Sequence, residues 1–104
     1  MIKVILAYHK DQVSEITITG HAQSGPYGQD IVCAGVSVAC IGALNALDVL
    51  CHTDCDLYMG DNCIDIKVLN HTDVVQNSLN FLKIQLETVS EQYPKAIQIT
   101  RKEV

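Results

Sequence analysis

One uncharged run, Ile31 to Leu47, constrains the fold of this chain more than any other segment. It lies between Asp30 and Asp48 and is interrupted by the polar residues Ser37 and Asn45. A membrane span needs about 20 predominantly apolar residues. Because the run is shorter than that and carries polar side chains, it predicts a helix buried inside a protein rather than a membrane span.

The predicted helix extends from Asp30 to about Leu50, because aspartate is a good N-cap and no proline interrupts the segment. Gly35 and Gly42 each cost about 1 kcal/mol relative to alanine in a helix interior. Their spacing along the helix has a second interpretation, in which they mark a side where another backbone packs closely.

Apolar and polar residues alternate in several segments, which is typical of strands. The predicted strands are residues 2–8, 13–20, 55–60, 63–69 and 96–100. In the second, Ile16 and Ile18 lie on one face and Thr17 and Thr19 on the other. Short polar turns join the first two strands and the next two, which predicts hairpins.

A second helix is predicted from about His71 to Gln92, capped by Thr72 or Asn70 and ended by Pro94. It has one apolar stripe, made of Val75, Leu79, Leu82, Leu86 and Val89. The element order is therefore ββαββαβ. It predicts a single α+β domain over residues 1–104, with a mostly antiparallel sheet and both helices packed on one face.

Charge and cysteine content narrow the classes of function. The net charge of -5 argues against nucleic-acid binding and suits a basic peptide partner, although many small cytosolic proteins are mildly acidic. Five cysteines, an odd number, in a chain without a signal peptide predict reduced thiols and a cytoplasmic location. We expect no metal, cofactor or membrane partner.

A histidine and a cysteine twelve residues apart are the candidate chemical groups. His21 follows the second predicted strand, and Cys33 falls in the first turn of the first predicted helix. Unpaired N–H groups and the helix dipole at that position favour a thiolate and hold an oxyanion, and His21 is a nearby general base. The alternative is that Cys33 is a small buried hydrophobic residue.

The surrounding residues leave further alternatives open. The predicted loop 21–29 contains Gly25, Pro26 and Gly28, which permit motion. Tyr27 either contacts substrate or is an exposed aromatic without a role.

Two more side chains each have two interpretations. Asp30 caps the helix, orients the His21 imidazole, or does both. Ser37 lies one turn after Cys33 and either bonds the thiolate or substrate or bonds back to the preceding turn.

The pattern around these residues resembles the Prp family of bacterial ribosomal-processing cysteine proteases. The matching positions are Gly20-His21-Ala22, Gly28, Asp30-Ile31-Val32-Cys33-Ala34 and Val36-Ser37. The element order agrees over nearly the whole chain, while Gly35 stands where alanine is more usual.

The resemblance implies a specific activity. Members of the family remove an N-terminal extension from a large-subunit ribosomal protein precursor, and they act as homodimers. By motif position, His21 is the general base and Cys33 the nucleophile, with Asp30 and Ser37 in support. The resemblance also implies that a mobile glycine loop, including Gly20, Gly25, Tyr27 and Gly28, closes over the peptide.

Two other functions compete with catalysis. Cys51, His52, Cys55 and Cys63 have zinc-ligand chemistry, but they lack a CxxC pair and fall at a helix end and a strand start. A non-catalytic module that grips a ribosomal protein or an assembly factor is the second alternative, although it has no need for both His21 and Cys33.

Overall fold

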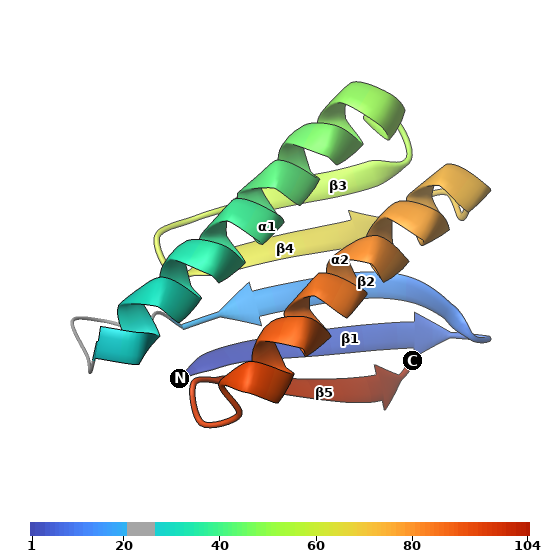
Figure 1. Cartoon of the computed structure of the whole chain (residues 1–104). Coiled ribbons are helices and arrows are strands. Elements are labelled where there is room, and N and C mark those ends of the chain that lie inside the picture. Colours follow the sequence, from blue (N-terminus) through green and yellow to red (C-terminus); the bar gives the residue numbers. More distant parts are fainter. Residues whose placement is uncertain (21–26) are drawn as a thin grey trace.

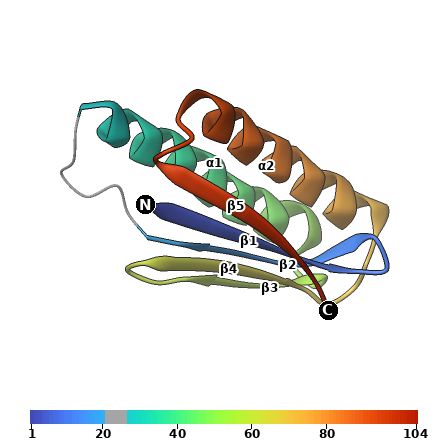
Figure 2. The same ribbon diagram turned by 90° about the horizontal axis from the view of Figure 1, so that it is seen from below.

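The chain folds into two layers, a sheet and a pair of helices on one of its faces (Figures 1 and 2). The computed structural model describes residues 1–20 and 27–104, with the backbone alone for residues 27–30. The elements in chain order are β1 (Ile2–His9), β2 (Gln12–Thr19), α1 (Tyr27–Cys51), β3 (Cys55–Met59), β4 (Cys63–Val68), α2 (Asp73–Gln92) and β5 (Ile97–Glu103). This order confirms the predicted ββαββαβ pattern.

The strands described form one sheet in the order β3-β4-β2-β1-β5. All neighbours are antiparallel except β1 and β5, which run parallel after the α2 crossover. The predicted faces are confirmed, since Ile16 pairs with Ile66 in the core and Thr17 donates a 2.7 Å hydrogen bond to Asp65 on the other face. The mostly antiparallel sheet was therefore predicted correctly.

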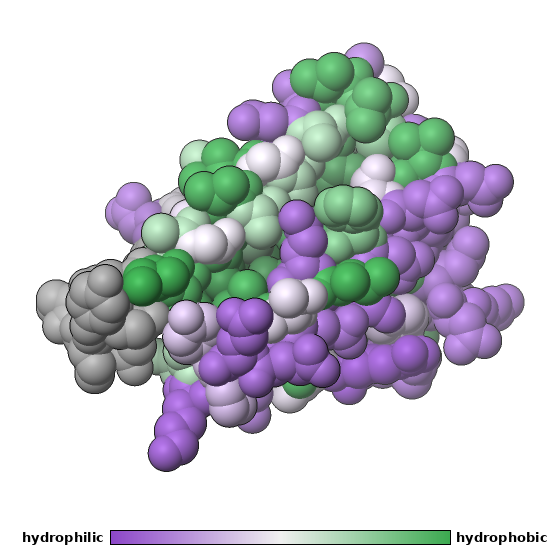
Figure 3. Space-filling model, in the orientation of Figure 1, coloured by the Kyte–Doolittle hydropathy of each residue, from purple (hydrophilic) through white to green (hydrophobic). Residues whose placement is uncertain are grey.

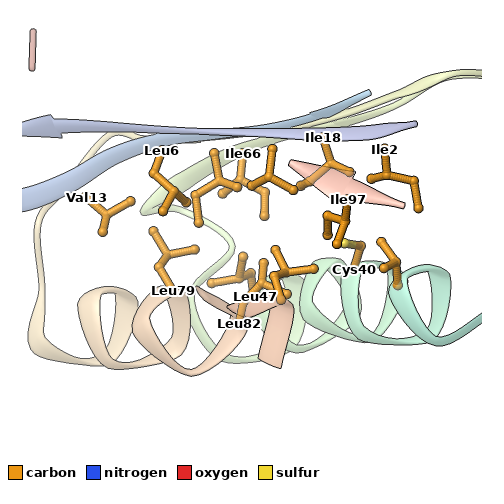
Figure 4. Packing of buried hydrophobic residues seen from close by; sticks show 14 of the residues in the cluster. Ile2, Leu6, Val13, Ile18, Cys40, Leu47, Ile66, Leu79, Leu82 and Ile97 are labelled. Atoms are coloured by element: carbon orange, nitrogen blue, oxygen red, sulfur yellow. The ribbon is translucent and has the colours of Figure 1, made fainter. Parts of the chain in front are cut away.

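The core lies between the sheet and the inner sides of both helices (Figure 4). The predicted stripe of α2 supplies Val75, Leu79, Leu82 and Leu86, each at most 1% exposed. Thr72 is the N-cap of α2, and its hydroxyl accepts a 3.2 Å hydrogen bond from the N–H of Val75. Burial of this stripe fixes α2 on the sheet.

The start of α1 differs from the prediction. The helix begins at Tyr27, so Asp30 lies inside its first turn and is not the N-cap. Tyr27 and Gly28 belong to the helix and not to a loop. The physical reason is that one glycine costs a helix only about 1 kcal/mol and that an acidic residue is favoured throughout the first turn, so neither ends the helix.

The burial of α1 also differs from the prediction, because only one side of the helix is covered. Val32, Val36, Cys40 and Leu47 are buried against the sheet, whereas Val38 is 75% exposed on the outer side. The segment 31–51 is long and apolar enough to cross a membrane by length and composition, but core helices share this property. Its inner side packs as a core helix does.

The outer side of α1 and the neighbouring side of α2 enclose an apolar groove of about 550 Å³. Space-filling Figure 3 shows hydrophobic and pale residues gathered mainly along α1, with some hydrophobic residues among the hydrophilic ones toward α2. Gly35 and Gly42 line this groove, and an added Cβ on either would meet nothing within 4 Å. No backbone within the described chain therefore packs against these two glycines, so the second interpretation of their spacing requires a backbone from another molecule.

Gly20 ends β2 in a conformation that suits only glycine. Its φ is +87°, and a Cβ there would overlap the carbonyl oxygen of Met1. Its N–H donates a 3.4 Å hydrogen bond to the carbonyl of Asn62 in the β3–β4 turn. Gly20 is thus held between β1 and the β3–β4 turn, at the point where the chain leaves the sheet.

Adjacent valines of α2 provide a matched test of this packing. Val75 is fully buried and Val74 is 51% exposed. We expect Val75→Ala to lower the free energy of unfolding by about 1–3 kcal/mol, because it removes two methyl groups and leaves a cavity. Val74→Ala should change it by less than about 0.5 kcal/mol. Urea unfolding of both variants measures the difference, and equal losses would contradict the described orientation of α2.

Candidate functional site

A small cavity of about 140 Å³ lies where the inner side of α1 passes over one end of the sheet. Its walls include Gly20 at the end of β2, and Cys33 and Ser37 on α1. The remaining lining residues are Ile2, Ile18, Val36, Cys40, Ile41, Met59, Gly60, Asn62, Cys63 and Ile64. The structure thus brings together three of the predicted site residues from two separate elements.

Cys33 is half-buried and accessible from this cavity. Because α1 begins at Tyr27, Cys33 occupies the second turn and not the first. The free N–H groups of a helix belong to its first four residues, so they lie one turn before Cys33 rather than around its backbone. The thiol therefore lies about one turn further from the helix terminus than the sequence predicted.

Ser37 is the next residue of α1 on the same side as Cys33, four positions later. It is half-buried and lines the same cavity. This position gives its hydroxyl access to the space in front of the thiol.

Other predicted site residues are placed less completely. Asp30 is in the first turn of α1, on the turn that precedes Cys33. His21 and Gly25 lie outside the described residues. Gly20 directly follows the last residue of β2, is bonded to the β3–β4 turn through its N–H and forms part of the cavity wall.

The β3–β4 turn is the part of the site that sequence reasoning missed. Met59, Gly60 and Asn62 form the cavity wall across from α1. Asn62 also accepts the hydrogen bond from Gly20. Nothing in the local sequence links residues 59–62 to Cys33, because the turn reaches the cavity only through the pairing of β4 with β2.

The other cysteines occupy different environments. Burial raises the pKa of the Cys40 thiol to about 11, which keeps it protonated at neutral pH. Cys63 begins β4, at the end of the strand opposite to Val68, which pairs with Cys55. Five residues of strand, about 17 Å, therefore separate Cys63 from Cys55, and these cysteines do not form the zinc site considered from the sequence.

Among the described residues, no group of three histidine, cysteine or acidic side chains is arranged to hold a metal ion. The geometry instead presents a half-buried thiol, a hydroxyl on the next turn and a small, mainly apolar cavity. This is an arrangement that a cysteine nucleophile can use to attack a carbonyl held in the cavity.

Comparison with known proteins identifies the family. Residues 1–98 match the model of the family described as cysteine protease Prp. The ribosomal processing cysteine protease Prp of Staphylococcus aureus is 32% identical over 94 residues, covering 88% of this chain and 89% of the relative. The protein of the same name from Mycoplasma pneumoniae is 31% identical over 100 residues, covering 93% of this chain and 91% of the relative.

A solved structure agrees over nearly the full length. The crystal structure of the S. aureus protease Prp with a covalently linked product peptide superposes with a TM-score of 0.88 and 31% identity. The match covers 98% of this chain and all of that chain. The family match, the relatives and the shared fold together show that this chain is a cysteine protease and belongs to the Prp family of ribosomal-processing proteases.

Proposed function

We propose that this protease removes the N-terminal extension of a large-subunit ribosomal protein precursor with a dyad of Cys33 and His21. The observation that carries the proposal is that Gly20 and Cys33 line the same cavity. His21 is the next residue after Gly20, so its Cα is one peptide unit, about 3.8 Å, from a residue of the cavity wall. The proposal requires the His21 imidazole to reach the thiol of Cys33 from this position.

The dyad performs an acyl transfer in two steps. His21 takes the proton of Cys33, and the thiolate attacks the carbonyl carbon of the scissile peptide bond. The imidazolium then gives its proton to the leaving amine, and the acyl group stays on the sulfur. The shortened protein leaves as this amine, and the acyl group on the sulfur is the N-terminal extension. A water molecule, deprotonated by His21, releases the extension as a carboxylic acid and restores the thiol.

The oxyanion of this reaction needs hydrogen-bond donors near Cys33. A helical side chain leans towards the N-terminus, so the Cys33 thiol lies over the turn that contains residues 29 and 30. The N–H groups of this first turn have no acceptor four residues earlier in the helix. We infer that they hold the oxyanion, and that a helix start one turn before Cys33 serves this purpose better than one at Cys33 itself.

The cavity also favours a peptide as substrate. Val36, Ile41 and Met59 give it apolar walls beside the thiol, which suit an apolar side chain of a peptide next to the scissile bond. The relatives named above are ribosomal-processing proteases, and one is crystallised with a substrate peptide. The five free thiols fit a reducing compartment, and we place the reaction in the cytoplasm.

The decisive experiment is cleavage of the ribosomal protein precursor. We expect the natural chain to shorten it and Cys33→Ala to be slower by at least about 10³-fold, because the nucleophile is lost. Mass spectrometry of the products measures both. Cys51→Ala is the matched control, since it removes a thiol from the far end of the same helix and should still cleave.

Each other outcome has a definite meaning. Equal cleavage by Cys33→Ala would refute the assignment of the nucleophile. Binding of the precursor without cleavage by either protein would favour the non-catalytic binding module. Loss of activity in Cys51→Ala with a normal melting temperature, together with full activity in Cys33→Ala, would assign the nucleophile to Cys51.

Thiol labelling tests the nucleophile without any substrate. We expect iodoacetamide at pH 7 to label Cys33 at least about tenfold faster than Cys63, which is also half-buried and lines the same cavity. Cys40 and Cys55 should label slowly, because burial raises the pKa of both thiols to about 11 and their thiolate fraction grows only as the pH approaches that value. Equal rates at Cys33 and Cys63 would contradict activation of Cys33, and peptide mapping gives the rates.

We also propose that the protease is a homodimer joined through the apolar groove of α1 and α2. A single chain leaves Val38 75% and Phe81 68% exposed there, and such large side chains gain free energy when a partner covers them. Gly35 and Gly42 have open space above them and admit close approach of another helix. A two-fold contact places the same surface of each copy against the other. The uncharged run of α1 supplies that surface on both copies.

Sedimentation equilibrium tests the dimer. The natural chain should have twice its mass of 11.4 kDa, and Phe81→Glu should shift it to the single-chain mass, because two buried carboxylates face the interface. Leu69→Glu is the control, since Leu69 is 61% exposed but lies outside the groove. A monomeric natural chain, or dissociation by Leu69→Glu alone, would refute this interface.

A further inference from the structure

A second pair of thiols lies at the opposite end of α1 from the catalytic cavity. Cys51 is the last residue of α1 and Cys55 the first residue of β3, and both are free thiols in the core, 6% and 5% exposed. Both side chains belong to the same buried core cluster, and only three residues connect them. The end of the helix and the start of β3 are therefore joined through a short connection with a buried cysteine at each end.

The short connection between these cysteines is held by several hydrogen bonds. The N–H of Asp54 donates a 2.9 Å hydrogen bond to the carbonyl of Cys51, and the carbonyl of Asp54 accepts from Leu69 and Asn70 at 2.8 and 3.1 Å. The Asn70 amide also donates to the Asp54 carboxylate at 3.1 Å. This turn keeps the backbones of Cys51 and Cys55 close together, which is the main geometric requirement for a disulfide.

No other described cysteine is within reach of this pair. Cys33 and Cys40 are 18 and 11 residues earlier in α1, about 27 and 16 Å along the helix. Cys63 is at the far end of the β3–β4 hairpin from Cys55. Each thiol of the pair therefore has the other as its partner in any intrachain disulfide.

We propose that Cys51 and Cys55 are a redox-sensitive dithiol, which oxidised glutathione or another small disulfide converts to an intrachain bond between α1 and β3. One thiolate attacks the small disulfide, forms a mixed disulfide and expels one thiolate of the reagent. The second cysteine, as its thiolate, attacks the sulfur of the first and expels the other half of the reagent. The pair loses two electrons and two protons, and the reagent becomes two thiols.

The environment of the pair makes its oxidation to a disulfide slow at neutral pH and faster at alkaline pH. Burial is the main cause that raises the pKa of both thiols, and the Asp54 carboxylate adds to it. The titratable neighbours of the pair on its own connection are Asp54 and the exposed His52. The oxidation rate should therefore rise as the pH increases from 7 to 9, because the thiolate fraction grows.

Peptide mapping of the native chain tests the proposal directly. The folded protein is incubated with oxidised glutathione at pH 8, its remaining thiols are blocked with N-ethylmaleimide in denaturant, and it is cut before aspartates. Cleavage before Asp48, Asp54 and Asp56 places Cys51 in the peptide 48–53 and Cys55 in the peptide 54–55. We expect these two peptides joined, with a mass two hydrogens below their sum.

Single variants separate this bond from general oxidation. In Cys40→Ala the two peptides should still be joined, because Cys40 is a separate buried thiol and does not belong to the pair. In Cys55→Ala the peptide 48–53 should never be found in an intrachain disulfide. A link from Cys51 or Cys55 to any other cysteine, or both peptides blocked and unjoined in the natural chain, would overturn the proposal. The result is independent of proteolysis at Cys33.

Discussion

The packing of one side of α1 on the sheet is the constraint on which the rest of the site depends. Val32 and Val36 are buried, and the residues that follow each of them, Cys33 and Ser37, are half-buried at the cavity. Since successive helical residues are about 100° apart, anchoring the valines fixes the direction of the thiol and the hydroxyl. The Cys33 thiol therefore needs no separate contact to orient it, because the hydrophobic burial that folds the chain also directs it toward the cavity.

The sheet provides the other half of the site at the end of β2. Gly20 donates a hydrogen bond to the Asn62 carbonyl there and lies beside the Met1 carbonyl with no room for a Cβ, in a conformation that other residues rarely adopt. The chain thus leaves the sheet toward His21 from a fixed point in the wall of the cavity that contains Cys33. Glycine at this motif position has a physical reason in the sheet, separate from any contact with substrate.

The sequence allowed most of the fold to be predicted, because periods of two and of about three and a half residues are local signals. The hairpins and the α2 stripe were predicted correctly, and Thr72 is one of the two caps that the sequence left open for α2. The start of α1 was not, because Asp30 is favourable both as a cap and within a first turn, and only tertiary packing decides between them. The β3–β4 turn could not be linked to the site, since strand pairing between distant segments brings it there.

The same few turns of α1 line the cavity on one side of the helix and the groove on the other. Cys33, Ser37 and Ile41 face the cavity, while Val38 and Gly42 face the groove against α2. These positions interleave along the helix, so any protein seated in the groove contacts the turns that carry the thiol. A second copy there would hold these turns from outside while the sheet holds them from inside, and the thiol would be confined on both sides. Apolar residues on both sides of this helix, costly for a monomer, then have a common explanation in the positioning of Cys33.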